Sequence, residues 1–76
     1  MSLVRKHSVS IRGHRTSFSL EQPFHDDLLT IAAERRMTLA ALVAEIDAAR
    51  PREANLSSAL RIHVLAWAKR AASHRP

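Results

Sequence analysis

The chain has 76 residues, with 12 Lys plus Arg against 7 Asp plus Glu, a formal net charge of +5 and no cysteine. Its length predicts a single domain over residues 1–76 with a small core, and the missing cysteines exclude disulfides, thiolate metal sites and a cysteine nucleophile. The basic balance favours a polyanionic partner, nucleic acid first and an acidic membrane surface second. No apolar run approaches the roughly 20 residues of a membrane span, so we expect a cytoplasmic protein without membrane contact.

Residues 15–20 alternate strictly between polar and apolar side chains, which is typical of a half-buried strand. One face carries Thr16, Phe18 and Leu20, and the opposite face carries Arg15, Ser17 and Ser19. The first face predicts contact with a core and the second predicts contact with solvent or a polar partner.

The preceding residues form a basic segment without any acid, and within it Val9 and Ile11 alternate with polar residues. The phase of this alternation changes at Gly13. A two-residue Gly13-His14 turn would make a hairpin with Ser10 opposite Ser17 and Arg12 opposite Arg15. A glycine bulge in one longer strand, or a loose arm before a short strand, would also explain the pattern, and the sequence leaves all three open.

Three helices are expected after the strand, over residues 22–36, 38–49 and 55–71. Pro23 suits the first turn of the first helix, Thr38 and Asn55 suit the N-caps of the other two, and Pro51 breaks the chain between them. Their inward stripes are Phe24, Leu28, Ile31 and Ala32, then Leu39, Leu42, Val43 and Ile46, then Leu56, Leu60, Val64, Trp67 and Ala68. The third helix has a second apolar stripe of Ile62, Leu65 and Ala66, which predicts a second neighbour. Residues 72–76 carry no periodic signal and are expected to fray.

A strand, a Pro-started helix and a Thr-capped second helix make residues 15–46 resemble the ribbon-helix-helix family of bacterial DNA-binding proteins, the MetJ/Arc/CopG type. Residues 6–21 and 55–61 are also similar to a small stand-alone bacterial subfamily of the same fold. The resemblance implies a mainly α protein with a short N-terminal β-ribbon, a ribbon-helix-helix dimer, here with an additional C-terminal helix. It implies an intermolecular ribbon whose outer face reads double-stranded DNA in the major groove.

The resemblance also assigns roles to particular residues. Base contacts fall on Arg15, Ser17 and Ser19. Contacts to the DNA backbone are expected from Arg5, Lys6, Arg12, Arg36, Thr38 and Leu39. The dimer core is expected to contain Phe18, Leu20, Leu42, Val43, Ile46 and Trp67. Because the apolar strand face and the second helix lack enough partners within one short chain, we expect an obligate homodimer.

Other interpretations remain beside these. The polar strand face could be merely solvated, the basic leader could serve solubility, and the third helix could bind a partner protein. A hairpin in each chain would widen the dimer ribbon to four strands, too broad for a groove about 12 Å wide. Arg36 stands where the family usually has glycine, so that turn could be of another type. The histidines lack metal-site spacing, and no nucleophile elbow or phosphate loop is present, so we expect no metal, no cofactor and no enzyme activity.

Overall fold

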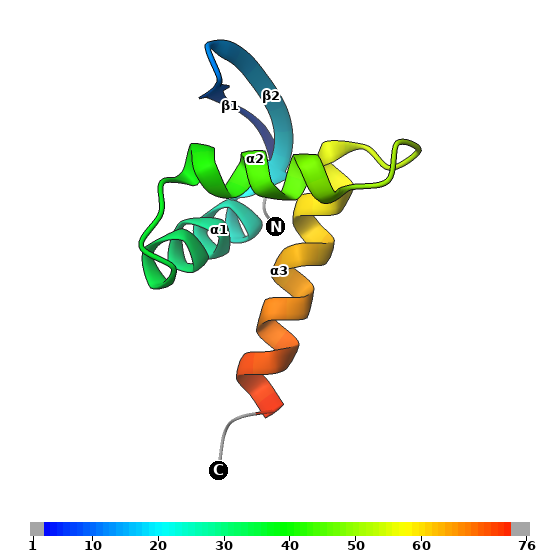
Figure 1. Cartoon of the computed structure of the whole chain (residues 1–76). Coiled ribbons are helices and arrows are strands. Elements are labelled where there is room, and N and C mark those ends of the chain that lie inside the picture. The colour runs from blue at the N-terminus through cyan, green and yellow to red at the C-terminus, as the bar shows by residue number, and fades with distance from the viewer. Residues whose placement is uncertain (1–2, 74–76) are drawn as a thin grey trace.

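The computed structural model describes residues 3–73, which form an N-terminal β-hairpin followed by three helices (Figure 1). This confirms the predicted fold class, a mainly α chain with a short N-terminal ribbon and an additional C-terminal helix. The elements are β1 (Val4–Ile11), β2 (His14–Glu21), α1 (Gln22–Glu34), α2 (Leu39–Ala49) and α3 (Leu56–Ser73). Helix α3 continues through residues 72 and 73, where fraying was expected, and residues 74–76 lie outside the described part of the chain.

Of the three arrangements that the sequence left open for the N-terminal segment, the structure has the hairpin, but its turn is Arg12-Gly13 and not Gly13-His14. Arg12 has φ 51° and Gly13 has φ 80°. A two-residue turn with positive φ at both positions is of type I′, which matches the right-handed twist of the flanking strands and favours glycine at its second position. The turn that was expected placed the glycine first, and it is wrong by one residue.

Moving the turn by one residue shifts the strand pairing by two. Ser10 lies opposite Arg15, whereas the expected pairs Ser10 with Ser17 and Arg12 with Arg15 do not form. Because side chains alternate with a period of two, this shift leaves every residue on the face that the sequence predicted. His7 now lies opposite Phe18.

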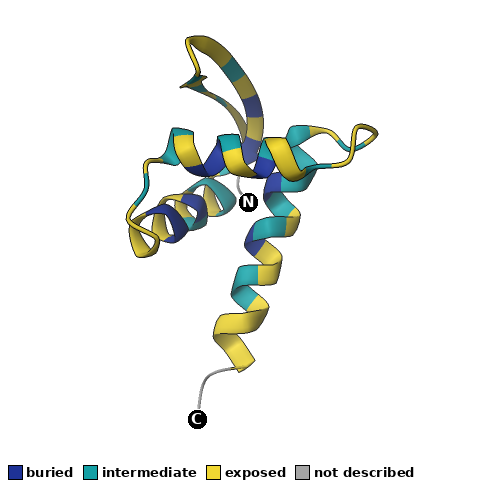
Figure 2. Ribbon diagram, in the orientation of Figure 1, coloured by how far each residue is buried: buried dark blue, intermediate teal, exposed yellow. Residues whose placement is uncertain are grey.

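The core forms where the base of the hairpin meets the three helices (Figure 2). Helix α2 packs against β1, while α1 and α3 pack against β2. In Figure 1 the hairpin and the far end of α3 project to opposite sides of α2. The buried residues are Phe18, Leu20, Leu28, Ile31, Ala32, Leu42, Val43, Ile46, Leu60 and Val64. Figure 2 shows exposed residues at the hairpin tip and along the last turns of α3.

Most residues that were expected to form a dimer core are already buried within one chain. Phe18 is 4% exposed, Leu20, Leu42 and Val43 are 0% exposed, and Ile46 is 6% exposed. Strand β1 and helix α3 provide the partners that we expected a second copy to supply. The argument for an obligate dimer from these residues is therefore wrong, because the chain covers them itself.

The turn between α1 and α2 is closed by two backbone hydrogen bonds. The N–H of Arg36 donates to the carbonyl of Ala33 (3.1 Å), and the N–H of Met37 donates to the carbonyl of Ala32 (2.9 Å). These two bonds define a Schellman motif, in which the residue after the cap takes a left-handed conformation. Arg36 occupies that position with φ 54°. The turn is thus of the left-handed type that glycine favours, built here with arginine, and the other turn type that the sequence left open does not occur.

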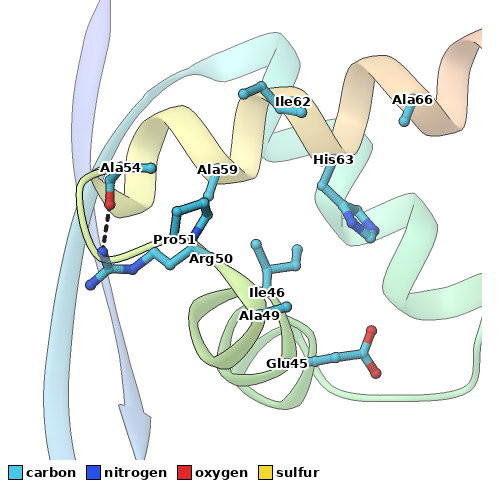
Figure 3. Close-up of a pocket in the computed structure, with 10 residues that line it drawn as sticks. All are labelled: Glu45, Ile46, Ala49, Arg50, Pro51, Ala54, Ala59, Ile62, His63 and Ala66. Atoms are coloured by element: carbon cyan, nitrogen blue, oxygen red, sulfur yellow. Dashed lines mark hydrogen bonds between the residues drawn. The ribbon is translucent and has the colours of Figure 1, made fainter.

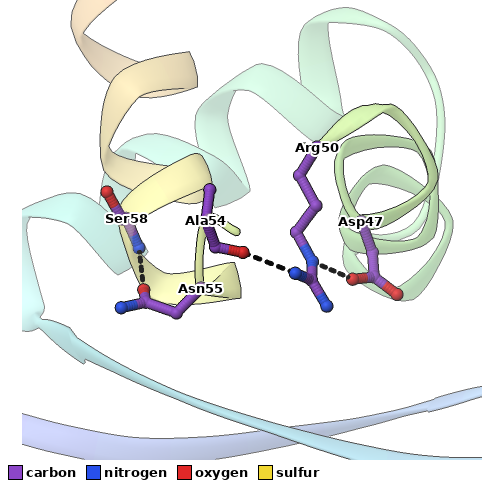
Figure 4. A network of polar contacts seen from close by, with 5 residues as sticks. All are labelled: Asp47, Arg50, Ala54, Asn55 and Ser58. Carbon is purple, nitrogen blue, oxygen red and sulfur yellow. Dashed lines mark hydrogen bonds and ion pairs between the residues drawn. The ribbon is translucent and has the colours of Figure 1, made fainter. Parts of the chain in front are cut away.

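Side-chain oxygens cap the two later helices as the sequence predicted. Thr38 Oγ1 accepts from the N–H of Ala41 (3.0 Å), and Asn55 Oδ1 accepts from the N–H of Ser58 (2.7 Å). Each bond satisfies one N–H of a first helical turn. Figure 4 shows the loop between α2 and α3, where Arg50 donates to Asp47 and to the carbonyl of Ala54. Arg50 therefore ties the end of α2 to the start of α3.

Candidate nucleic-acid interface

The outer face of the hairpin is polar and exposed. Strand β2 contributes Arg15, Ser17 and Ser19, the three residues that the sequence assigned to base contacts, and all three are exposed. Between them Phe18 and Leu20 point inward and are buried, because the strand alternates. The structure thus brings the three expected reading residues into one row on the surface.

Strand β1 adds a second row to this face. Lys6 lies opposite Ser19, Ser8 opposite Ser17, and Ser10 opposite Arg15, and the β1 residues are exposed too. Ser8 and Ser10 were not among the residues expected to contact DNA, and Lys6 was expected only at the backbone. The alternation of Ser8 and Ser10 with Val9 and Ile11 already indicated that the two serines share a face. The sequence did not show that this segment is a strand paired with residues 14–21, because the position of the turn was unknown.

Arg15 and Ser8 are joined across the two strands. Arg15 Nε donates to Ser8 Oγ at 3.3 Å. The bond uses Nε and leaves the two terminal guanidinium nitrogens unengaged by Ser8. Those two nitrogens are able to make a bidentate contact with the O6 and N7 acceptors of guanine.

The remaining charges around this face are mostly positive. Arg12 is exposed in the turn, whereas Arg5 is exposed at the base of the hairpin but lies opposite Leu20, on the row of β1 that faces away from Lys6 and Ser8. The only acid of the two strands, Glu21, lies at the end of β2 and accepts from Arg61 Nε at 3.0 Å. A hydrogen bond with its own backbone, and then the Arg61 guanidinium, lower the pKa of Glu21 below its usual range. Glu21 is therefore ionised at neutral pH, but its charge is paired with Arg61.

The N-terminus of α2 has the chemistry of an anion site. Thr38 Oγ1 accepts a hydrogen bond from the N–H of Ala41, and the N–H groups of Leu39 and Ala40 do not take part in this bond. Helix N-termini combine such N–H groups with the positive end of the helix dipole. Thr38 is exposed and Leu39 is partly buried. In the view of Figure 1 this end of α2 and the hairpin tip lie toward the same side of the molecule.

The two arginines before α2 differ in their contacts. Arg35 makes a bidentate ion pair with Glu45, with nitrogen-to-oxygen distances of 2.6 and 2.8 Å. The hydrogen bonds between the two side chains lower the pKa of Glu45 and raise the pKa of Arg35. Arg36 is exposed, and within residues 3–73 its side chain has no ion pair. Arg36 is consequently the better placed of the two to meet a phosphate.

The edge of β2 that faces away from β1 is partly occupied by α3. The backbone N–H of Ser19 donates to Ser57 Oγ at 3.1 Å. Ser57 lies in the first turn of α3, and the Glu21–Arg61 ion pair joins the same helix to the end of β2. Helix α3 therefore takes a hydrogen-bond position that a neighbouring strand would need.

The imidazole rings of His7 and His25 stack at the junction of β1 and α1. Their centroids are 4.0 Å apart with an interplanar angle of 7°, and His7 also stacks on Phe18. Burial and then the His7 charge lower the pKa of His25, and Asp26 opposes this. Among residues 3–73 no cluster of three or more His, Cys, Asp or Glu side chains could hold a metal ion, and His74 lies outside that range.

An apolar groove separates the C-terminal half of α2 from the outer side of α3 (Figure 3). Its volume is about 480 Å³, and its apolar lining includes Ile46, Ala49, Ala59, Ile62 and Ala66. Ile62 is 63% exposed, and Leu65 on the same helix is 52% exposed. Ile62 and Ala66, two of the three residues in the second stripe that the sequence predicted on the third helix, line this groove, and the single chain leaves them uncovered.

Trp67 lies at the margin of the core, half-buried. Its ring packs against the buried cluster, and its Nε1 donates to Glu34 Oε1 at 3.0 Å.

Within the described residues, no helix is sufficiently long and apolar to cross a lipid bilayer.

A family model described as a ribbon-helix-helix domain matches residues 4–68, which is most of the chain and includes the hairpin, α1, α2 and α3 as far as residue 68. No curated protein and no solved structure matched significantly.

Proposed function

The chain belongs to the ribbon-helix-helix family, and from this premise we propose that it is a dimeric, sequence-specific DNA-binding protein that regulates transcription. The family consists broadly of DNA-binding regulators, not enzymes, and its domains typically form dimers that bind DNA. The observation that carries the proposal is the division of β2 into a buried apolar face and an exposed row of Arg15, Ser17 and Ser19. A regulator of this kind would act at the nucleoid.

In this proposal Arg15 supplies most of the base discrimination. A bidentate arginine contact distinguishes guanine from the other bases, whereas a serine hydroxyl can donate to or accept from several bases. Ser17 and Ser19 would therefore refine a preference that Arg15 establishes. The ordinary alternative, a merely solvated strand face, predicts no base preference at all.

Contacts to the DNA backbone would come from two places. The N–H groups of α2 at Thr38 and Leu39, with Arg36 beside them, would hold one phosphate. Lys6, Arg5 and Arg12 would add contacts that position the protein without specifying sequence. Each of these three side chains should contribute to the salt dependence of DNA binding.

We propose that the two copies meet through the apolar groove between α2 and α3. The residues first expected in the dimer core are covered within the chain, so they are poor candidates for the main contact surface. Ile62 and Leu65 form an exposed apolar stripe beside the groove, which favours a self-complementary contact between two α3 helices.

The proposal is tested by selecting bound duplexes from a random pool at about physiological salt, because a chain of charge +5 binds any DNA at low salt. We expect enrichment of a two-fold symmetric motif. Arg15→Ala should then lose about 1–3 kcal/mol at one base position in each half-site. No motif, together with wild-type binding by Arg15→Ala, would show that the hairpin is not a reader.

The dimer surface is tested by sedimentation at micromolar concentration. Ile62→Lys should convert the dimer to a monomer because it places a charge in an apolar contact. The matched control is Leu29→Lys on α1, which also replaces an exposed apolar residue (45% exposed) but lies outside the groove. A wild-type chain that sediments as a monomer, or an Ile62→Lys variant that stays dimeric, would contradict this assignment.

The same apolar surface supports a second candidate, an antitoxin-like interaction module whose C-terminal helix binds a partner protein. Salt separates the two functions. DNA affinity should fall steeply as salt rises, whereas an apolar contact between helices should change little. A monomeric chain that shows no salt-dependent DNA binding would favour the interaction module.

A further inference from the structure

His7 of β1 and His25 of α1 form a histidine pair that joins the hairpin to the helices. The centroids of the two imidazole rings are 4.0 Å apart, and the rings are nearly parallel, with an interplanar angle of 7°. His7 also stacks on Phe18 of β2, at 5.6 Å between centroids, and Phe18 is buried in the core. The three rings therefore form one stack that runs from the base of the hairpin to α1.

Two ring nitrogens of the histidine pair are buried without a hydrogen-bond partner among residues 3–73, namely Nε2 of His7 and Nδ1 of His25. A neutral imidazole has one N–H and one bare acceptor nitrogen, whereas an imidazolium has an N–H at both positions. Neutral rings can place their acceptor nitrogens at these two buried atoms. A protonated ring would have to bury an N–H there without an acceptor, which is costly. The closed stack therefore favours the neutral form of both rings.

Charges around the histidine pair also oppose its protonation. Two imidazolium rings in this stack would hold like charges 4.0 Å apart. Burial, and then the charge of His7, lower the pKa of His25, whereas Asp26 acts in the opposite direction. Asp26 Oδ1 already accepts from Gln22 Nε2 at 2.8 Å, and Arg5 adds a positive charge on the same row of β1 as His7. Acids on the other strands and helices around the pair have basic partners: Glu21 of β2 with Arg61, Glu45 of α2 with Arg35, and Asp47 of α2 with Arg50. Asp26 can therefore offset one added proton but not two.

We propose that the histidine pair is a pH-sensitive contact, which holds the hairpin on α1 while both rings are neutral and opens when they are protonated, so that acid weakens sequence-specific DNA binding. The inference rests on the proposed DNA-binding function and adds a means of regulation to it. The reading row of Arg15, Ser17 and Ser19 lies on the hairpin, whereas the phosphate contact proposed at Thr38 and Leu39 lies at the start of α2. A duplex can meet both only if the hairpin keeps a fixed position on the helices.

The direction of the pH effect distinguishes this contact from general electrostatics. The chain has five histidines and a net charge of +5 when they are neutral, so acid makes it more positive and strengthens its binding to any phosphate backbone. In the open state each ring of the pair takes up a proton near the ordinary histidine pKa of about 6.5. Between about pH 7.5 and 5.5 the ratio of open to closed protein therefore rises about 10-fold for each proton that the closed pair excludes. Specific binding should weaken over this range while non-specific binding strengthens.

The first test follows the stack itself, by NMR of the full chain without DNA. A nuclear Overhauser effect between ring protons of His7 and His25 should be present at about pH 7.5, because the rings are 4.0 Å apart, and should be lost at about pH 5.5. The far-UV circular dichroism of the helices should be retained at both values, since the contact opens locally. A stack that persists in acid, or that is lost only together with the helical signal, would overturn the proposal.

The second test measures affinity for the selected duplex and for a scrambled duplex at both pH values and at physiological salt. The wild-type protein should lose affinity for the selected duplex in acid. His25→Phe keeps a ring for the stack and removes the proton site, so it should not show this loss. His7→Phe should behave in the same way and serves as a second variant. His63→Asn is the matched control, because His63 is also partly buried with a lowered pKa but lies on α3, and it should retain the wild-type loss. His14→Gln, which removes an exposed histidine of the hairpin, should retain it too.

The outcomes separate this inference from the function on which it rests. If the wild-type affinity for the selected duplex does not fall in acid, or falls equally in His25→Phe and His7→Phe, the histidine pair does not regulate DNA binding, although the protein still reads DNA. If no duplex is enriched from the random pool and Arg15→Ala binds as wild type, the proposed function itself fails and this regulation fails with it. A loss of the stack in acid, together with a loss of specific affinity that both phenylalanine variants abolish, is the result that we expect.

Discussion

Replacing Arg36 with glycine should stabilise the protein. Arg36 has φ 54° at the left-handed position of the Schellman motif, where a residue with a Cβ pays about 1–2 kcal/mol. Glycine regains that energy, but its greater freedom in the unfolded chain takes back about 0.4–1 kcal/mol. The Arg36 side chain is exposed, and both bonds of the motif come from backbone N–H groups, so the substitution removes no contact that closes the turn. The net gain is about 0.5–1 kcal/mol.

Urea and thermal unfolding at a fixed protomer concentration would measure this gain, because dimerisation would otherwise change the apparent stability. For a domain of this size it corresponds to a rise in Tm of about 2–8 °C. Arg36→Ala is the matched control, since it removes the same charge and keeps the Cβ, and it should give no increase. If Arg36→Gly is no more stable than Arg36→Ala, the left-handed conformation is not the source of the strain. Both variants should weaken DNA binding equally if Arg36 holds a phosphate.

Two further predictions concern the packing of α3 and two partly buried histidines, His25 and His63. Trp67→Ala should lower the free energy of unfolding by about 2 kcal/mol, less than the roughly 3–5 kcal/mol of a fully buried Trp, because the ring is half-buried. Trp67→Phe should recover part of this loss. If Trp67→Ala costs less stability than Glu34→Ala, which removes only the hydrogen-bond acceptor, the ring does not pack as described. Stability should fall as the pH drops below about 6.5, because burial lowers the pKa of both His25 and His63 and the unfolded chain then binds more protons than the folded one. His25→Asn should flatten the pH dependence of the urea midpoint, His63→Asn should flatten it independently, and a dependence unchanged in both variants would show that other groups cause it.

The sequence alone predicts which side chains lie on each face of the ribbon. Strict alternation over residues 15–20 places Phe18 and Leu20 inside and Arg15 outside whatever the register, because a shift of two residues preserves every face. The helix caps at Thr38 and Asn55 were also readable, since each depends on one side-chain oxygen and the next three residues. Local signals of this kind do not need the rest of the fold.

The pairing register was not readable from Gly13 alone. Both candidate turns place the glycine at a position of positive φ, and they differ in whether Arg12 or His14 takes the other one. Arg12 gains no obvious local advantage there. Its position is selected by the rest of the hairpin, where His7 reaches Phe18 and stacks on His25 of α1. Contacts with a helix 18 positions away along the chain are tertiary information, and alternation in a single segment does not contain it.

The premise that these residues need a second copy failed for a related reason. The expectation considered the inward residues of α2 and β2 without the contacts that β1 and α3 of the same chain make with them. Leu42 and Val43 need no second copy once β1 and α3 cover them, and the exposed apolar residues include Ile62 and Leu65 on α3. The two proposed roles lie on different parts of the molecule, because the hairpin carries Arg15 and α3 carries Ile62. If α3 holds the second copy as proposed, changes at Ile62 should alter assembly without altering which base Arg15 reads.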